Sequence, residues 1–374
     1  MCRRRGSGSG VAADFVYDAA PKRVYWELTR ACDLACRHCR AEAIPCRDPG
    51  ELTTDEGRRL LDALYGFGGA GPAVVLTGGD PLKRPDFWDL LAHGVGLGLD
   101  VAVAPSATPL LTAEAVVRLK QAGVRAMSLS LDGFDPARHD GFRGVPGCFV
   151  RTMDAARAAV DAGISLQVNT LVTADSLGDL PRVLDLVRGL RAARWSLFFL
   201  IQVGRGQGLQ QLTPLACERL LAWLYARSRE GGCLVTATEA PHFRRVALQA
   251  MRGDGSRAAG GHAGGLRHGF GIRDGNGIMF VSHVGDVQPS GFLPLVAGNV
   301  RATHPVAVYR DAPLFRLLRE PDGFHGRCGR CEFRQVCGGS RARAYAATGD
   351  PVGEDPLCLY EPGRRAAAGA EEDA

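Results

Sequence analysis

The chain has 374 residues, of which 46% are hydrophobic and 23% charged, and its formal net charge at pH 7 is +5. This length suits one large α/β domain with an appendage, and the composition is that of a soluble globular protein. The mild, scattered positive charge gives no reason to expect a nucleic-acid partner. No apolar run reaches the roughly 20 residues that cross a membrane, so no membrane partner is expected either.

The N-terminus and the cysteine usage indicate a reducing compartment. Residues 1–13 are basic and rich in Gly and Ser, without the apolar stretch of a secretory signal, and we expect residues 1–20 to form a disordered lead. Twelve cysteines without such a signal argue against a disulfide framework and predict a cytoplasmic protein. Two compact groups of cysteines indicate metal binding: Cys32, Cys36 and Cys39, and then Cys328, Cys331, Cys337 and Cys358.

The first part of the chain predicts a strand, a cysteine loop, a helix and a second strand. Val24 to Thr29 is an apolar strand that leads directly into the first cysteine group. Thr53 and Glu56 form a capping box, which predicts that a helix begins there. The apolar run 73–76 then ends in Thr-Gly-Gly-Asp-Pro, and such a run predicts a buried parallel strand that feeds a loop.

This pattern of strand and amphipathic helix then repeats. Helices are expected over 87–95, 113–121, 150–162 and 180–190, and strands over 101–104, 126–131, 166–171 and 195–203. Six strands separated by helices predict an α/β fold with a parallel sheet. Because the count stops near six, we expect a partial (β/α)6 TIM-like barrel, with its chemistry at the C-terminal ends of the strands.

The alternation of strands and helices changes beyond Val203, and we expect a barrel core over 21–235 and a small second domain over 236–360. Helices are expected over 214–229 and 241–251. Residues 252–277 are rich in Gly and Arg and predict a mobile loop that could act as a lid. A β-hairpin over 278–288 turns at Gly285, and residues 361–374 are expected to be a disordered tail.

The first cysteine group has the spacing of an open metal site. Cys32, Cys36 and Cys39 supply three thiolates, which are soft ligands that suit an iron–sulfur cluster or zinc. Three thiolates leave one coordination position free, and a free position marks a reactive site. The plain alternative is a zinc knuckle with a remote fourth ligand.

The second cysteine group forms a closed set. Four thiolates in the pattern Cys-x2-Cys-x5-Cys-x20-Cys, beginning at Cys328, complete the coordination of one centre. Structural zinc is the alternative from this spacing alone. Iron is favoured once the first loop is taken as an iron–sulfur site.

Together these motifs resemble the radical S-adenosylmethionine (SAM) superfamily, with a C-terminal auxiliary-cluster domain of the SPASM or twitch type. The resemblance covers most of Tyr25 to Tyr360. It implies that Cys32, Cys36 and Cys39 hold a 4Fe-4S cluster whose fourth iron is chelated by SAM. Reductive cleavage of SAM would then yield methionine and a 5′-deoxyadenosyl radical, which abstracts hydrogen from the substrate. It also implies an electron donor such as flavodoxin or ferredoxin.

The resemblance implies further contacts to SAM. The loop Gly78, Gly79, Asp80 and Pro81 stands where the family has a loop that grips the methionine amino group; its plain alternative is an ordinary turn. It also implies that Ser130 and Asp132 contact the ribose, and Asn169 is similarly placed on the next strand; the alternative for Ser130 and Asp132 is strand-end capping. Arg143 would pair with the SAM carboxylate, and its alternative is a surface ion pair. His38 would lie beside the adenine as a packing residue.

Two departures from the family pattern limit the number of clusters. Ser290 and Arg341 stand where relatives with two auxiliary clusters have cysteines. We therefore expect one auxiliary cluster, and two 4Fe-4S clusters in all.

The segment from Cys337 to Tyr345, and the residues around Cys358, resemble the radical enzymes of alternative haem biosynthesis and of nitrite-reductase haem synthesis. This implies a tetrapyrrole substrate, although Ser340 replaces a cysteine found in some of these enzymes. Arginine side chains would pair with the carboxylates of a tetrapyrrole, and a histidine could approach a porphyrin iron. The candidates are Arg205, Arg244, Arg245, Arg267, Arg273, Arg341 and Arg343, with His242, His283 and His304, although most are expected to be ordinary polar residues.

Two other functions stay open at this point. The chain could be a maturase of ribosomally made peptides, although the short segment before Val24 leaves no room for a peptide-recognition domain. It could also be a non-catalytic iron–sulfur redox or sensor protein. The loop at Gly78 together with Ser130 and Asp132 favours an enzyme, because an electron carrier needs no contacts to SAM.

Overall fold

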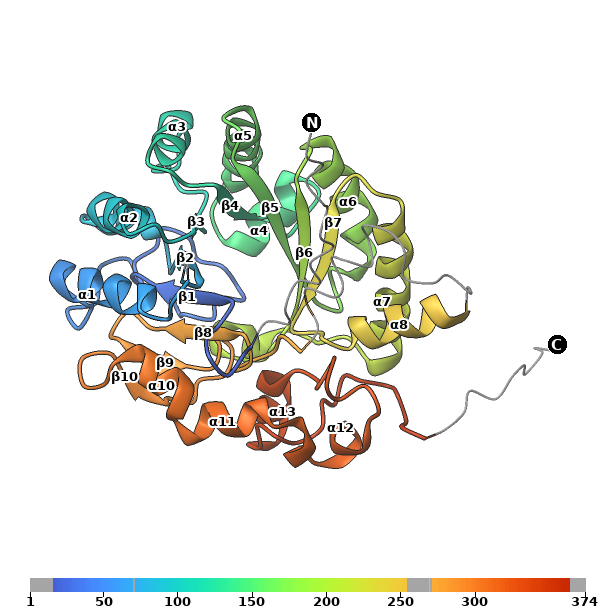
Figure 1. Cartoon of the computed structure of the whole chain (residues 1–374). Helices are drawn as coiled ribbons and strands as arrows, with labels where there is room; N and C mark the ends of the chain where they lie inside the picture. Colours follow the sequence, from blue (N-terminus) through green and yellow to red (C-terminus); the bar gives the residue numbers. More distant parts are fainter. Residues whose placement is uncertain (1–15, 70, 254–268, 270, 364–374) are drawn as a thin grey trace, which may run out of the picture.

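The structure, a computed structural model, describes residues 16–69, 71–253, 269 and 271–363, and its strands join in one ten-stranded sheet. The order across the sheet is β10-β9-β8-β1-β2-β3-β4-β5-β6-β7, and the strands from β8 to β7 in that order are parallel (Figure 1). The strands are β1 Arg23–Glu27, β2 Ala73–Thr77, β3 Val101–Val103, β4 Ala126–Ser130, β5 Ser165–Val172, β6 Arg194–Phe199, β7 Leu234–Thr238, β8 Ile278–Val281, β9 Asp286–Gln288 and β10 Gly298–Asn299.

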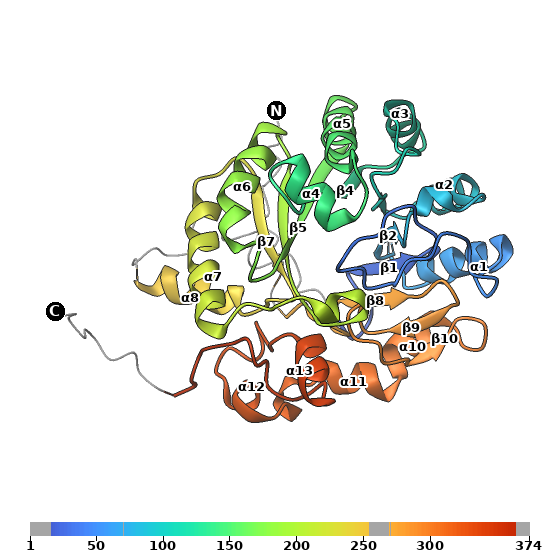
Figure 2. The same ribbon diagram turned by 180° about the vertical axis from the view of Figure 1, so that it is seen from behind.

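Helices cover the outside of the curved sheet and build the C-terminal unit (Figures 1 and 2). They are α1 Thr54–Tyr65, α2 Phe87–Gly96, α3 Ala113–Gln121, α4 Pro136–Arg143, α5 Cys148–Asp161, α6 Leu180–Gly189, α7 Pro214–Arg229, α8 Phe243–Gly253, α10 Pro305–Asp311, α11 Pro313–Arg319, α12 Gly326–Arg330 and α13 Arg341–Thr348. None of the described helices is both long and apolar enough to cross a membrane. The α/β partial barrel and its small C-terminal unit are confirmed.

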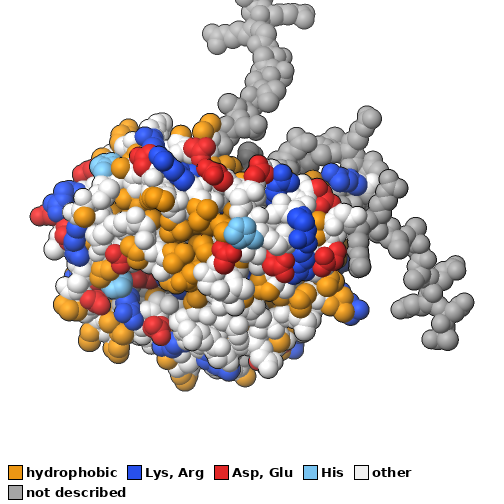
Figure 3. Space-filling view, turned by 90° about the horizontal axis from the view of Figure 1, so that it is seen from below, with side chains coloured by type: hydrophobic (Ala, Val, Ile, Leu, Met, Phe, Trp, Pro, Cys, Tyr) orange, Lys and Arg blue, Asp and Glu red, His pale blue; other side chains and the backbone are white. Residues whose placement is uncertain are grey.

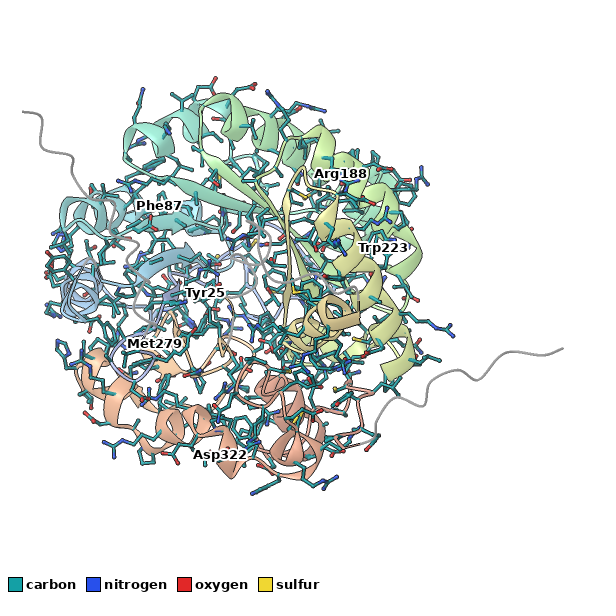
Figure 4. All side chains as sticks on the ribbon, turned by 45° about the vertical axis from the view of Figure 1, so that its right-hand side comes forward. Tyr25, Phe87, Arg188, Trp223, Met279 and Asp322 are labelled. Carbon is teal, nitrogen blue, oxygen red and sulfur yellow. The ribbon has the colours of Figure 1, made fainter. Side chains whose placement is uncertain are left out.

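Alternation along the strands separates the two faces of the sheet. Val24 and Trp26 on β1 are fully buried and belong to the core under the outer helices. The close packing there needs Gly57 on α1, because a Cβ at this position would lie 2.8 Å from the Trp26 ring. Tyr25 lies on the opposite face, is only partly buried, and points into the space that the strands surround (Figure 4). The inner face is therefore the one left for a site.

Local sequence signals account for the helix ends. The capping box at α1 is confirmed: Thr53 Oγ1 accepts a bond from the Glu56 N–H, and the Glu56 carboxylate accepts one from the Thr53 N–H. The helices expected over 113–121 and 214–229 have the observed bounds, each preceded by a threonine cap. The hairpin over 278–288 is confirmed as β8 and β9.

The sheet extends beyond the six expected strands. β7 adds a parallel strand beside β6, and β8 of the C-terminal unit pairs in parallel with β1. The expected boundary at 235/236 therefore falls within β7, and the C-terminal unit shares the sheet with the barrel. In the described part of the chain, β7 and β8 are not paired with each other, so the barrel stays open on that side.

Three segments expected to be flexible are described only in part. Residues 16–20 form a turn that Tyr309 holds through its hydroxyl, rather than a free lead. The expected loop over 252–277 is wrong at both ends, because residues 252–253 end α8 and residues 271–277 form a largely buried turn. The rest of that loop (with Arg267), residues 1–15 and residues 364–374 lie outside the described residues.

The face seen from below in Figure 3 carries acidic and basic side chains interspersed around a central apolar area. This face presents no continuous basic surface.

Candidate functional site

The loop that carries the first three cysteines is bound to the loop after β2 through the backbone. The Gly79 N–H donates to the Thr29 carbonyl and the Asp80 N–H to the Ala31 carbonyl, each at 2.8 Å. Gly78 has a φ of 150°, and a Cβ there would lie 2.4 Å from the Thr29 oxygen. A Cβ at Gly79 would lie 2.5 Å from the Ala31 oxygen. Both glycines are therefore required by the contact itself.

Protein donors already surround the three thiols. Cys32 Sγ accepts a bond from the Leu34 N–H at 3.4 Å, and Cys39 Sγ one from the Ala43 N–H at 3.3 Å. Arg143 Nη1 lies 3.5 Å from Cys36 Sγ. Donors of this kind favour anionic sulfur and tune an iron–sulfur cluster, so the residues present fit that group.

Asp80 serves the loop rather than an open site. Its carboxylate is fully buried and accepts bonds from Thr108 Oγ1 at 2.7 Å and from the Leu82 N–H at 3.2 Å. Burial raises the pKa of this carboxyl group. Ser106, whose N–H also approaches Asp80, links the Gly79 carbonyl at 2.6 Å to the Cys32 thiol at 3.6 Å. Contact between Asp80 and SAM stays a prediction.

Asp132 and Arg143 form a buried ion pair beside Cys36. Asp132 accepts bonds from Arg143 Nη2 and, at 2.7 Å, from the Leu171 N–H. Burial opposes the charge of Asp132, but the Arg143 guanidinium prevails and lowers the pKa of that carboxyl group. Asp132 therefore positions Arg143 against the thiol loop. Each oxygen of Asp132 thus accepts one bond from the protein, and its contact with the ribose stays a prediction.

The remaining residues predicted to contact SAM lie at the same ends of the strands. Ser130 and Asn169 are register partners on β4 and β5, and both are partly exposed on the inner face. His38 stacks on Phe142, with ring centroids 4.8 Å apart and an interplanar angle of 16°. Burial, reinforced by the charge of Arg143, lowers the pKa of His38 to about 4, so the ring is neutral at pH 7.

The second cysteine group lines one pocket. All four thiols, Cys328, Cys331, Cys337 and Cys358, contribute to its wall. Arg341 Nη2 lies 3.5 Å from Cys328 Sγ, and Arg245 Nη2 lies 3.8 Å from Cys358 Sγ. Burial raises the pKa of Cys337 to about 12 and of Cys358 to about 11, so these thiols ionise only when a metal replaces the proton.

In the part of the chain that the structure describes, no three His, Cys, Asp or Glu side chains are arranged to hold a single metal ion. An iron–sulfur cluster at these four thiols stays a prediction, with zinc as its alternative.

Most arginines and histidines considered for a substrate are engaged by the fold. Arg341 binds the Pro351 and Gly353 carbonyls, Arg343 pairs with Asp355, and Arg245 pairs with Glu218. Arg244 and Arg273 donate to backbone carbonyls. His242 contacts the Cys217 thiol, and His283 contacts Glu27. His304 caps the N-terminus of α10. In contrast, Nε and Nη2 of Arg205 have no hydrogen-bond partner among the described residues.

Sequence reasoning missed a pair of carboxyl groups, Glu239 and Asp274. Glu239 follows β7 with a φ of 58°, and Ser340 Oγ donates to its Oε2 at 2.5 Å. Asp274 Oδ2 accepts the first two N–H bonds of α13, from Arg341 and Ala342. Burial, followed by the charge of Asp274, raises the pKa of Glu239 well above its usual value. Only the position of Glu239 directly after a strand could have indicated it.

The chain is similar to known proteins in its family motif and along most of its sequence. The family model of the Radical SAM superfamily matches residues 26–187. The AdoMet-dependent heme synthase of Methanosarcina barkeri is 40% identical over 351 residues, covering 92% of this chain and 98% of that protein. The pre-heme d1 synthase of Dinoroseobacter shibae is 30% identical over 358 residues, covering 90% of this chain and 85% of that protein.

The fold is also that of a solved structure. SuiB of Streptococcus suis bound to S-adenosylmethionine superposes with a TM-score of 0.71 at 18% identity, covering 91% of this chain and 78% of that one. At this identity the likeness concerns the fold alone.

Replacing Gly79 by alanine should separate the two loops. The new Cβ would meet backbone oxygens of Arg30 and Ala31 at 2.6 and 2.5 Å, and neither can move without shifting the cysteine loop. We expect about 1–3 kcal/mol of destabilisation and the loss of about half the bound iron. Thermal unfolding and iron analysis after anaerobic reconstitution would measure both. Gly96→Ala, where a Cβ meets open space, is the control; full iron in Gly79→Ala would contradict the prediction.

The Glu239 carboxyl predicts a pH dependence of stability. Because its pKa is raised in the folded state, its contribution is fully present below its unfolded pKa and is lost as the pH rises through the folded value. As the pH rises above about 4.5, the melting temperature should therefore fall more steeply in the wild type than in Glu239→Gln. Glu230→Gln, at an exposed carboxylate whose pKa is lowered, is the control. Parallel curves for wild type and Glu239→Gln would refute this.

Proposed function

Since the chain belongs to the radical SAM superfamily, we propose that it is an enzyme of haem-type tetrapyrrole biosynthesis, which cleaves SAM and directs the radical at a carboxylated tetrapyrrole. The observation that carries this proposal is the 40% identity to an AdoMet-dependent heme synthase over nearly the whole of both chains. This similarity includes the C-terminal unit, where four thiols line one pocket.

The first site would hold a 4Fe-4S cluster on Cys32, Cys36 and Cys39, with SAM at the fourth iron. When bound, these groups supply an electron to the sulfonium of SAM and, from it, a 5′-deoxyadenosyl radical. The chain's own part is to fix the thiol loop through the glycine contact and to hold Arg143 toward Cys36 through Asp132. A low-potential protein such as flavodoxin or ferredoxin would deliver the electron.

The second site would hold one auxiliary 4Fe-4S cluster on the four thiolates that begin with Cys328. The guanidinium groups of Arg245 and Arg341 lie beside two of these sulfurs and would stabilise a cluster that carries net negative charge. Ser290 and Arg341, which replace cysteines of double-cluster proteins, are both buried and serve the fold.

Metal analysis tests the number of clusters. Anaerobically reconstituted protein should contain about eight iron and eight sulfide per chain if each site holds one 4Fe-4S cluster. About twelve of each would indicate a second auxiliary cluster, and stoichiometric zinc would replace the auxiliary cluster altogether.

Two cysteine variants should separate the roles of the two sites. With SAM, dithionite and a panel of carboxylated tetrapyrroles, Cys36→Ala should abolish 5′-deoxyadenosine formation, because the thiol belongs to the SAM-binding site. Cys331→Ala should retain SAM cleavage and lose tetrapyrrole conversion, measured by mass spectrometry. Cys46→Ala, an exposed cysteine outside both groups, is the control.

Equal loss of both readouts in Cys331→Ala would contradict the separate roles. SAM cleavage by the wild type with no conversion of any tetrapyrrole would contradict the proposed substrate class and leave the peptide-maturase function. Tight binding of SAM without cleavage would instead indicate a non-catalytic protein.

A further inference from the structure

Arg205 is a half-buried residue whose guanidinium has two nitrogens without an acceptor. It lies in the short 3-10 turn Gly204–Gly208 that follows β6, at the end of the barrel where the cysteine loop lies. Its Nε and Nη2 are buried and have no hydrogen-bond partner in the structure. A buried N–H group without an acceptor costs about 1–3 kcal/mol, and a ligand that accepts bonds from both nitrogens would recover this free energy.

The backbone of Arg205 is fixed against the cysteine loop. The Arg205 N–H donates to the Cys39 carbonyl at 3.2 Å. Gly204 has a φ of 51°, and a Cβ there would lie 2.7 Å from both the Cys39 and Arg40 carbonyl oxygens. The backbone from which the Arg205 side chain extends is therefore fixed beside the cysteine loop.

Neighbouring arginines have counter-ions, whereas Arg205 has none among the described residues. Arg143 is paired with Asp132, and Arg40 is paired with Glu27 at 2.7 Å. Arg205 also lies at the cysteine loop, where its charge contributes to the lowered pKa of His38. An anionic ligand that binds at this position would supply the counter-ion of Arg205.

The wall beside this turn is apolar. Leu200 and Leu209 flank the turn in sequence and form a small cluster with Leu171, against which Phe142 and Phe198 pack with part of their surface exposed. Phe198 in turn lies 6.3 Å from Phe292, measured between ring centroids. An apolar, partly aromatic wall with one unpaired guanidinium matches a flat macrocycle that carries carboxylate side chains.

We propose that Arg205 binds a carboxylate of the substrate, and that it selects tetrapyrroles with a free acid at that position. This inference rests on the proposed function. A guanidinium accepts a carboxylate in bidentate geometry, and both unpartnered nitrogens, Nε and Nη2, lie on one edge of the group. Arg205 thus determines specificity, and the radical chemistry stays at the first cluster.

The test compares two forms of one ligand on the reconstituted holoenzyme. Iron coproporphyrin III and its tetramethyl ester, in the same detergent, are titrated anaerobically and followed by Soret absorbance. The wild type should bind the free acid about tenfold or more tightly than the ester, as expected for a charged hydrogen-bonded pair. Arg205→Met should abolish this preference through weaker binding of the acid, and Arg205→Lys should restore part of it. Arg316→Met, an exposed arginine paired with Asp311, is the control.

Each outcome decides the inference. An unchanged preference in Arg205→Met would overturn it, and so would a loss of SAM affinity in equilibrium dialysis with the preference intact, since Arg205 would then serve the carboxylate of SAM. If the wild type bound neither porphyrin, the proposed function itself would fail. Arg205→Gln is the second uncharged variant should the methionine variant lose iron or fold poorly.

Discussion

The position of the reactive site depends on the close approach of two backbones. The loop after β1 carries three thiols, and it reaches its place only because the loop after β2 presents Gly78 and Gly79 with no side chain between them. The parallel pairing of β1 and β2 continues past the strand ends through this contact. Ser106, after β3, is then bonded to the Gly79 carbonyl and approaches the Cys32 thiol. The loops that follow β1, β2 and β3 thus together fix the position of the Cys32 sulfur.

The second site uses buried charge for a similar purpose. Arg341 and Arg343 lie in the first turn of α13, shortly after Cys337, and their guanidinium groups bind carbonyls and a carboxylate of residues 351–355, beyond the end of that helix. One of them also reaches Cys328. Charged hydrogen bonds are strong where they are shielded from water, so they help this small unit to hold four thiols around one pocket.

Periodicity and spacing were enough to predict the barrel and both cysteine groups, because each is a local pattern. α3 and α7 have the predicted bounds, whereas β7 was missed because its residues Leu234–Thr238 are largely exposed or partly exposed. The pairing of Asp132 with Arg143, or of Glu239 with Asp274, depends on how distant segments pack. The abundance of arginine concealed the difference between Arg341, which binds carbonyls, and Arg205, whose Nε and Nη2 have no partner among the described residues.

The pairing of β8 with β1 has a consequence for biosynthesis. β1 is the first of the described strands to leave the ribosome, but the partner for one of its edges, Ile278–Val281, is among the last described parts of the sheet to be made. Until then the nascent barrel exposes an unpaired edge of an apolar parallel strand, which is a template for association with other chains. The same late contact brings the second cysteine group to the barrel. Translation therefore makes the two cysteine groups, within residues 32–39 and 328–358, available for folding at different times.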